Sequence, residues 1–328
     1  MTQDPEQDVT RDHLRLLARV ARMYHEQGIR QPEIAAALNL SQPRVSRLLK
    51  EAVTRGLVRT VVTLPDGVHT ELEEELQRRY GLRDAVVVDV EDFQEDVIPP
   101  LATAAAAYLD VTLIGGDVVG ITPWSRTLQA TVSRLPQKNA RAAERVIQLA
   151  GGLGRPEAQV HATRLIARLA DLTNARPVFV PLPGVVATSA IREALLQDPD
   201  LAEVQAQWRD LTLTLTGIGS LNPGGVHDGG DPGGDPGGVP GPADQEELRG
   251  LGAVGDVCLH FFDATGKPVA SALDRRVIGI DSATFRAVER RVGIAGGLRK
   301  LAAIRAAVEG GWVNVLITDL RVARRLCA

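Results

Sequence analysis

The chain has 328 residues, of which 44% are hydrophobic and 24% charged, so it is long enough for two globular domains with buried cores. Its formal net charge is −4, its two cysteines make no disulfide framework, and no apolar run approaches the ~20 residues that cross a bilayer. The acidic N-terminal segment MTQDPEQDVTRDH lacks the apolar core of a secretion signal, so we expect a cytoplasmic protein with no membrane association.

The first predicted unit, residues 11–64, begins with three helices. One is expected over about residues 12–27, and two more lie within residues 31–57, QPEIAAALNLSQPRVSRLLKEAVTRGL. Asn39 supplies the turn between the last two because Asn tolerates left-handed backbone angles, and Ser41 is a suitable N-cap for the third helix. Apolar residues at helical spacing would form the buried faces: Ile34, Ala35 and Leu38 in the second helix, and Val45, Leu48, Leu49, Ala52 and Val53 in the third.

The outer face of the third helix carries the residues that we expect to contact DNA: Gln42, Arg44, Ser46, Arg47 and Lys50. Gln and Arg near the N-terminal end of such a helix suit base-edge contacts in the major groove. Residues 41–59 hold five cations and one anion, a net charge of +4 that favours phosphate contacts. The pattern therefore predicts a helix-turn-helix that binds double-stranded DNA. The alternative is a solvated basic helix of a helical bundle.

A strand, a turn and a charged helix follow. The β-branched run VRTVVTL at residues 58–64 predicts a strand that would form a small wing against DNA, so the helix-turn-helix is of the winged type. Pro65-Asp66-Gly67 is a turn and a candidate hinge, and a helix is expected over about residues 71–80. We assign 65–81 as hinge and linker helix. The composition leaves open whether this helix connects the domains or pairs with a second subunit.

From residue 82 to 328, apolar strands alternate with helices. The expected strands are 85–90, 116–121, 145–150, 177–182, 211–219, 256–262, 291–296 and 313–318, and the helices between them include 126–134, 158–171, 188–196 and 298–308. Continuous β-branched strands separated by helices indicate a mainly parallel sheet covered on both faces, as in Rossmann-like, doubly wound α/β domains. The order of the strands in the sheet does not follow from the pattern.

Residues 222–242 interrupt this alternation with nine glycines and five prolines. The segment has almost no apolar side chains to offset its ordering entropy, so we expect a mobile loop. Asp228, Asp231 and Asp235 alternate as calcium ligands would. The Gly-Pro spacing and the lack of a suitably placed Glu argue against a metal site.

Several predicted strands end in residues that suit an anionic ligand. In an open parallel sheet, ligands bind beyond the carboxyl ends of strands, where glycines, hydroxyls, cations and helix N-termini can hold a phosphate. The candidates are Ser125, Arg126 and Thr127 after 116–121, Gly151 and Gly152 after 145–150, Gly217 and Gly219 in 211–219, and Gly296, Gly297 and Lys300 after 291–296. One such turn alone is more often structural, and Trp124 is expected to pack rather than stack on a ligand. The four turns together indicate a phosphorylated small molecule.

The order of these motifs along the chain resembles the SorC/DeoR-type bacterial transcriptional regulators. The matching segments are 31–58, WSRTL at 124–128, QLAGG at 148–152, GIG at 217–219, GAVGDVCLHFFDATGKPV at 252–269, LDRRVIGI at 273–280, 295–319 and ARRL at 323–326. The resemblance implies an effector and oligomerisation domain at 82–328 that binds sugars and is similar in fold to sugar-phosphate isomerases and deaminases. It also implies a phosphate-holding turn at Ser125, Arg126 and Thr127, an anion-binding Lys300, and sugar-pocket positions at Asp256 and Arg276.

The chain departs from the family pattern at three places. Gln42 stands where the family usually has Arg, so base preference would differ, and Pro123 and the 222–242 loop are also unusual. The combined expectation is a DNA-binding repressor of carbohydrate metabolism genes, whose operator affinity a phosphorylated sugar controls. One helix-turn-helix contacts few base pairs, so dimers or tetramers on repeated half-sites are expected. We expect no catalytic residue, no metal and no cofactor beyond the sugar-phosphate effector.

The main alternative is an enzyme that isomerises or deaminates a sugar phosphate, with the first domain as an accessory, since a fold alone does not decide function. His161 and His260 lie in the predicted core regions, but neither belongs to an evident acid–base pair. His260 falls in a predicted strand, where a hydrogen-bonded core histidine is the simpler interpretation. A third alternative is a DNA-architectural oligomer with a vestigial pocket.

Overall fold

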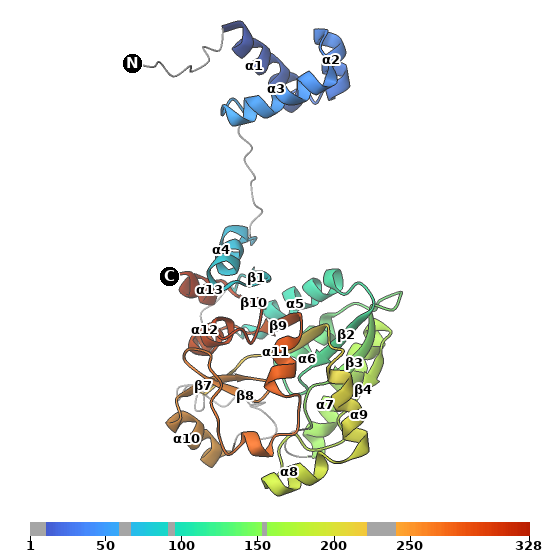
Figure 1. The fold of residues 1–328 in the computed structure, drawn as a ribbon, viewed down its shortest axis with the longest axis vertical. Helices are drawn as coiled ribbons and strands as arrows, with labels where there is room; N and C mark the ends of the chain where they lie inside the picture. The colour runs from blue at the N-terminus through green and yellow to red at the C-terminus, as the bar shows by residue number, and fades with distance from the viewer. Residues whose placement is uncertain (1–10, 59–66, 91–95, 153–155, 222–240) are drawn as a thin grey trace, which may run out of the picture. The chain divides into compact units, whose positions relative to one another are not determined.

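The computed structural model describes residues 11–58, 67–90, 96–152, 156–221 and 241–328 (Figure 1). The chain divides into two compact units, residues 1–64 and 65–328, with the division at the predicted hinge. In the part of the chain that the structure describes, no helix is both long enough and apolar enough to cross a membrane.

The N-terminal unit contains three helices, α1 (Arg11–His25), α2 (Gln31–Leu38) and α3 (Gln42–Thr54). Asn39 ends α2 with φ 52° and ψ 45°, the left-handed conformation expected of the turn. Its core consists of Leu17, Val20, Ala21, Ile34, Ala35, Val45, Leu48, Leu49 and Ala52. The predicted helix-turn-helix is thus confirmed. The strand predicted at 58–64 lies outside the described residues, apart from Val58.

One local expectation in this unit is wrong, and another is confirmed in its position but not in its side-chain bond. Val53 is 53% exposed, because the preceding apolar residues of α3 already occupy its inward face. Ser41 stands at the N-cap position of α3, but its side chain accepts no helix N–H. Pro43 has no N–H to donate, and the Arg44 N–H donates instead to the backbone oxygen of Ser41 at 3.0 Å.

The second unit is built on a seven-stranded sheet. Its strands are β1 (Asp84–Val88), β2 (Asp117–Ile121), β3 (Ala143–Gln148), β4 (Arg176–Val178), β5 (Leu213–Gly217), β9 (Arg290–Ile294) and β10 (Val315–Asp319). Their spatial order is β1-β10-β9-β5-β2-β3-β4, and each neighbouring pair is parallel. The expected parallel sheet is confirmed.

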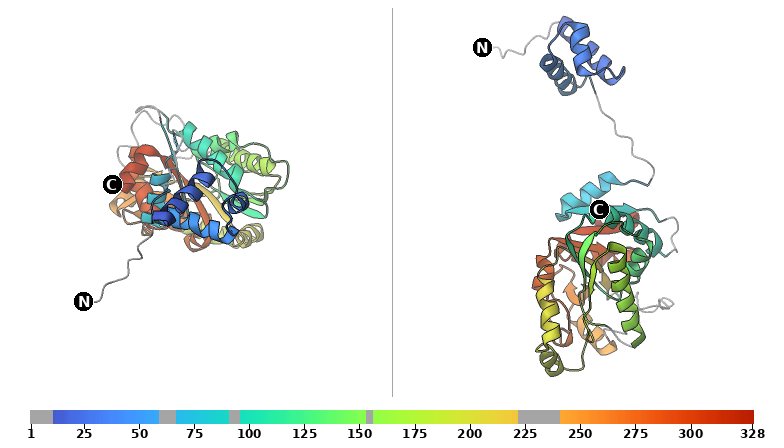
Figure 2. Two further views of the ribbon diagram at one scale, coloured as in Figure 1. Left: turned by 90° about the horizontal axis from the view of Figure 1, so that it is seen from above. Right: turned by 90° about the vertical axis from the view of Figure 1, so that its right-hand side faces the viewer.

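Helices cover both faces of this sheet (Figure 2). One face packs against α5 (Ile98–Thr112), α6 (Arg126–Arg134) and α7 (Pro156–Thr173), and the other against α4 (Thr70–Tyr80), α9 (Pro199–Trp208), α12 (Leu301–Glu309) and α13 (Leu320–Cys327). The other helical segments are α8 (Ser189–Leu195), α10 (Pro242–Gly250), α11 (Ser282–Ala287) and the 3-10 turns η2 (Asp274–Arg276) and η3 (Leu298–Lys300). Because both faces are covered, the strands are apolar at consecutive positions.

The charged helix α4 packs on the second unit. Leu76 is fully buried there, the Val87 N–H donates to Glu73 Oε1 at 2.9 Å, and the Tyr80 hydroxyl donates to the Leu326 backbone oxygen at 2.8 Å. The helix predicted between the domains is therefore attached to β1 and α13, a placement that its composition did not decide.

The strand predicted at 256–262 is wrong. This segment is a hairpin of β7 (Ala253–Val257) and β8 (His260–Asp263), which joins β6 (Gly219–Ser220) in a small antiparallel sheet. Cys258 and Leu259 form its two-residue turn at φ 54° and 63°, and the Leu259 N–H donates to Asp256 Oδ2 at 3.1 Å. Apolar residues rarely adopt positive φ, so the composition of this turn hid it.

The loop predicted at 222–242 ends earlier than expected. Pro242 is already the first residue of α10, a position where the missing N–H of proline costs nothing. Residues 222–240 lie outside the described residues, so the expectation for them stays a prediction.

The side of the sheet to which the chain adds new strands changes between β2 and β5, although all these strands are parallel. From β2 the chain continues outward to β3 and β4, and it then adds β5, β9 and β10 on the other side of β2. At such a switch point the connections after two adjacent strands leave a crevice at the carboxyl edge of the sheet. The turns predicted to hold a ligand after β2 and β5 fall at this position.

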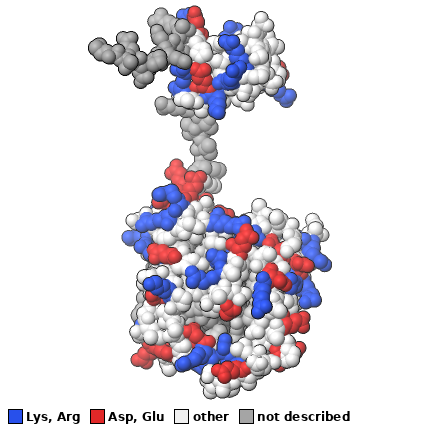
Figure 3. Space-filling view, in the orientation of Figure 1, with Lys and Arg blue, Asp and Glu red and all other residues white. Residues whose placement is uncertain are grey.

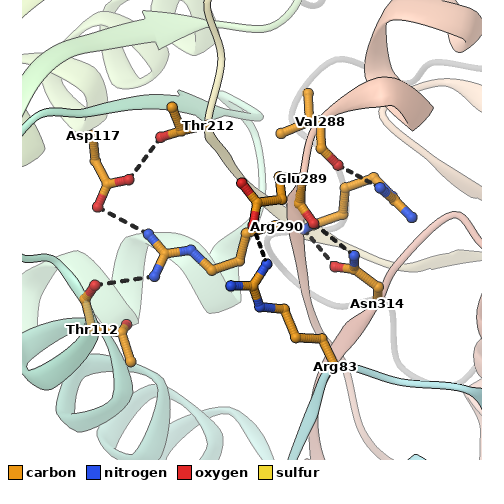
Figure 4. A network of polar contacts seen from close by, with 9 residues as sticks. Arg83, Thr112, Asp117, Thr212, Val288, Glu289, Arg290 and Asn314 are labelled. Carbon is orange, nitrogen blue, oxygen red and sulfur yellow. Dashed lines mark hydrogen bonds and ion pairs between the residues drawn. The ribbon is translucent and has the colours of Figure 1, made fainter.

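A polar network joins the opposite, amino-terminal ends of β2, β5 and β9 (Figure 4). Arg290 forms an ion pair with Asp117 at 2.9 Å and donates to the Thr112 backbone oxygen at 3.0 Å. Asp117 also accepts from the Thr212 hydroxyl at 2.7 Å. The network therefore holds three central strands and α5 in register at the edge opposite the candidate ligand turns.

Candidate functional site

The five residues predicted to contact DNA, Gln42, Arg44, Ser46, Arg47 and Lys50, are all exposed on α3. The opposite face of α3 is buried in the core of the unit, so the polar face points outward. Lys and Arg side chains lie on the surface of this unit (Figure 3). An exposed helix with polar and basic side chains is the arrangement that enters a major groove.

Glu51, the anion among residues 41–59, forms hydrogen bonds to other residues of the N-terminal unit. It accepts from His13 Nε2 at 3.1 Å, which joins α1 to α3, and from Arg55 Nε at 2.7 Å. The bonds from His13 and then Arg55 hold the pKa of Glu51 below its ordinary value. Arg55 is thus paired with a carboxylate at the end of α3 that lies away from the predicted base contacts.

Arg47→Ala is expected to weaken operator binding by about 1–3 kcal/mol and to relax base preference, because a guanidinium in the groove contacts a guanine through two hydrogen bonds. Fluorescence anisotropy with labelled duplex at fixed salt measures the change. Arg22→Ala, which removes an exposed arginine paired with Glu26 on α1, is the control and should bind as the parent does. Unchanged affinity and base preference in Arg47→Ala would show that Arg47 contacts no base.

The turn after β2 places Ser125 beside the end of β5. Ser125 is the N-cap of α6, and its Oγ accepts from the Leu128 N–H at 3.3 Å. A Cβ added to Gly217 would lie 3.0 Å from that Oγ, so glycine allows the two turns to approach. Thr127 is partly exposed and Arg126 exposed in the first turn of α6, while Trp124 packs in the core as expected. The structure thus brings the β2 and β5 turns together.

Lys300 reaches the same loop from η3. Its Nζ donates to the Ile218 backbone oxygen at 3.0 Å. Asp256 of β7 lies beside this loop. A Cβ added to Gly219 would be only 1.9 Å from Asp256 Oδ1, so glycine is required at that position. Burial lowers the pKa of Lys300, and the charge of Asp256 opposes that shift. The ammonium group suits a phosphate, and the carboxylate suits the hydroxyl groups of a sugar.

The residues brought together at this edge are partly exposed, so a ligand can reach them: Ser125, Gly217, Gly219, Asp256, Gly297 and Lys300. Gly296 is buried, and a Cβ added to it would lie 2.6 Å from Asp319 Oδ2. Gly297 has φ 86°, which favours glycine, and its N–H donates to the same oxygen at 2.6 Å.

Two other parts of the predicted site have evident structural partners. Gly151 and Gly152 are buried, and a Cβ on Gly151 would lie 2.4 Å from the Leu182 backbone oxygen, so glycine permits close backbone packing there. Arg276 forms an ion pair with Asp244 of α10. Ligand contact by these three predicted residues stays a prediction.

Asp319 is a residue that sequence reasoning missed. It ends β10, is fully buried, and accepts from the Arg321 and Val322 N–H groups at the start of α13 as well as from Gly297. An Asp directly between an apolar strand and a helix is a recognisable N-cap signal. The hydrogen bond between Gly297 and Asp319 could not be predicted from the sequence, because it forms only where β9 and β10 are neighbours in the sheet.

A cavity of about 330 Å³ is lined in part by the β7–β8 hairpin, and its lining includes His260, Arg192, Asp274 and Trp312. His260 Nε2 donates to the Ile280 backbone oxygen at 3.0 Å, and its ring stacks on Trp312 at 5.6 Å. Burial lowers the pKa of His260. It has the contacts of a hydrogen-bonded core histidine, as the sequence suggested. Within the described ranges, no group of residues has the composition of a metal site.

Comparison with known proteins gives matches to both units. Residues 67–328 match a family model described as "Putative sugar-binding domain", and residues 7–67 match the MarR family. The deoxyribonucleoside regulator of Bacillus subtilis is 30% identical over 318 residues, 96% of this chain and 98% of that protein. The erythritol catabolism regulatory protein EryD of Brucella abortus is 32% identical over 95% of this chain and 96% of that protein.

Solved structures extend the similarity to the fold. The full-length sorbitol operon regulator SorC from Klebsiella pneumoniae matches with a TM-score of 0.71 and 26% identity, over 97% of this chain and 100% of that one. These relatives are transcriptional regulators and not enzymes.

Proposed function

The chain belongs to the SorC/DeoR family of sugar-binding transcriptional regulators, and we propose that its effector is a phosphorylated sugar bound at the β2–β5 switch point. The observation that carries this proposal is the bond from the Lys300 ammonium group to the Ile218 carbonyl, which lies between Gly217, beside the Ser125 hydroxyl, and Gly219, beside Asp256. A partly buried ammonium group favours an anion, which it binds through charge-assisted hydrogen bonds. Asp256 would bind hydroxyl groups of the same ligand.

The exposed polar and basic face of α3 supports double-stranded DNA as the partner of the N-terminal unit. A single reading helix contacts few base pairs, so we propose a dimer or tetramer on repeated half-sites. The names of the relatives refer to deoxyribonucleosides, sorbitol and erythritol, which supports control of carbohydrate metabolism genes. We propose that the protein is a repressor whose operator affinity changes when the sugar phosphate binds.

A thermal-shift series on the full chain tests the effector class. The probes are deoxyribose 5-phosphate, sorbitol 6-phosphate and erythritol 4-phosphate, each beside its unphosphorylated counterpart and beside inorganic phosphate. The proposal expects at least one phosphorylated probe to raise the melting temperature more than its unphosphorylated form, because binding to the folded state stabilises it. Equal shifts from the unphosphorylated forms would show that the phosphate is not recognised, and chemical turnover of a probe followed by NMR would favour the enzyme interpretation.

A further inference from the structure

The turn that contains Lys300 is connected to α13 through one buried carboxylate. Gly297 donates its N–H to Asp319 Oδ2 at 2.6 Å, while Asp319 Oδ1 accepts from the Arg321 and Val322 N–H groups at 3.0 and 3.1 Å. Asp319 has no exposed surface. The carboxylate therefore holds both the ligand turn and the N-terminus of α13.

The far end of α13 is bonded to α4. The Tyr80 hydroxyl donates to the Leu326 backbone oxygen at 2.8 Å, and Arg79 donates to the Cys327 backbone oxygen. Buried side chains of α13 strengthen this packing: Val322, Ala323 and Leu326. A shift of α13 along or about its axis must therefore move α4 or break these bonds.

The helix α4 is also the first helix after the segment that leads from the DNA-binding unit. Its N-terminal end is held by a hydrogen bond between His69 Nε2 and Asp89 Oδ1 at 2.8 Å, just beyond β1. In the sheet, Val88 at the end of β1 is paired with Asp319. The ligand turn, Asp319, α13 and α4 thus form a continuous series of hydrogen-bonded elements that ends where the chain passes to the DNA-binding unit.

The Gly297 N–H is the point at which a ligand would act on this series. An anion bound at the turn of Gly296 and Gly297 needs backbone N–H donors, yet the Gly297 N–H already serves the Asp319 carboxylate. The two anions would compete for one donor and repel each other. Gly297, at φ 86°, can reorient its peptide with less steric cost than other residues.

We propose that Asp319 is the positioning residue through which occupancy of the effector site reaches the DNA-binding unit. The anionic ligand takes the Gly297 N–H, the Asp319 carboxylate shifts toward its bonds with α13, and α13 moves α4 through Tyr80. This inference rests on the proposed function, because it requires an anionic ligand at the Lys300 turn. Asp319, α13 and Tyr80 would convey the signal, and the ligand and Asp319 would compete for the Gly297 N–H.

Two variants of the full chain test the series at separate points, Asp319→Asn and Tyr80→Phe. The controls are Asp198→Asn, which alters an N-cap with the same pattern of two helix N–H donors on α9, and Tyr108→Phe on α5. The probes are the three sugar phosphates named above, and the DNA is a duplex selected from a random library by the unaltered chain. Three quantities are measured: probe affinity alone, operator affinity alone, and the coupling factor, which is the ratio of operator affinities with and without saturating probe.

For the unaltered chain and both controls we expect a coupling factor of about fivefold or more. Tyr80→Phe should retain both separate affinities within about twofold, with a coupling factor close to one. Asp319→Asn should bind the probe several-fold more tightly, because the competing charge is gone, and should also lose coupling. Damage to the fold would instead weaken probe binding.

Coupling that is unchanged in both variants, or lost equally in the controls, would overturn the role of Asp319 and leave the effector site standing. A chain in which no probe binds would instead contradict the proposed function, and the proposed role of Asp319 with it. If Asp319→Asn does not fold, Tyr80→Phe and its control still decide between the outcomes.

Discussion

Lys300→Met is expected to weaken sugar-phosphate binding by roughly 30-fold or more, about 2 kcal/mol, while operator affinity without effector is retained. Methionine keeps the apolar stem of the side chain but removes the ammonium group at the Ile218 carbonyl and beside Asp256. A phosphate in the site would lose its charge-assisted bond to Lys300, and the Asp256 carboxylate would then repel it. Calorimetric titration with the probe that gives the largest thermal shift measures the loss.

Two further variants show whether the charge of Lys300 is the cause. Lys267→Met removes an exposed lysine elsewhere in the unit and should leave binding unchanged. Burial lowers the pKa of Lys300, so raising the pH above neutrality should neutralise it before ordinary lysines and reduce affinity for a phosphate dianion. Lys300→Arg keeps its charge at these pH values, so its affinity should be independent of pH. Undiminished binding by Lys300→Met would place the phosphate elsewhere.

Arg290→Met should lower the free energy of unfolding of the second unit by about 3 kcal/mol. The Arg290 and Asp117 side chains are only 15% and 13% exposed, so the substitution leaves a largely buried carboxylate without its cation. It also removes the donor to the Thr112 backbone oxygen at the end of α5 (Figure 4). Urea unfolding followed by circular dichroism, with the slope of the transition unchanged, measures the difference.

The neighbouring ion pair provides the control for this prediction. Arg83 and Glu289 also join β1 to the start of β9, but their side chains are 52% and 75% exposed. Solvent screens such a pair, so Arg83→Met should change the free energy of unfolding by no more than about 1 kcal/mol. Equal effects of Arg83→Met and Arg290→Met would mean that burial does not determine the contribution of the Arg290–Asp117 pair.

The DNA-binding unit was largely predictable because its signals are local. The turn depends on Asn39, and the spacing of Val45, Leu48 and Leu49 defines which face of α3 is buried. Ser41 is the N-cap of α3 as predicted, but its backbone oxygen, and not its side chain, accepts from Arg44 next to a proline that cannot donate.

The proposed effector site was predictable only in part, because its turns are brought together by the order of the strands in the sheet. The turns at Ser125, Gly217 and Lys300 were each recognisable, but their meeting depends on β2, β5 and β9 being adjacent. The bond from Gly297 to Asp319 likewise needs β9 beside β10. Neither order follows from a pattern of apolar strands.

The hairpin at β7 and β8 shows a different limit. Cys258 and Leu259 are apolar and extend an apolar run, so periodicity predicts one strand. The chain nevertheless turns at these residues, where Asp256 accepts the Leu259 N–H and the flanking strands pair. Long-range pairing overrides local preference at this position.

A sugar phosphate can control operator binding only if the DNA-binding unit and the proposed effector site are energetically coupled. The most direct measurement is an anisotropy titration of operator duplex with the full chain, in the absence of effector and at a sugar-phosphate concentration that saturates the thermal shift. We expect operator affinity to change by about fivefold or more, and operator to change sugar-phosphate affinity by the same factor. Operator affinity that stays the same while the effector site is saturated would contradict this coupling.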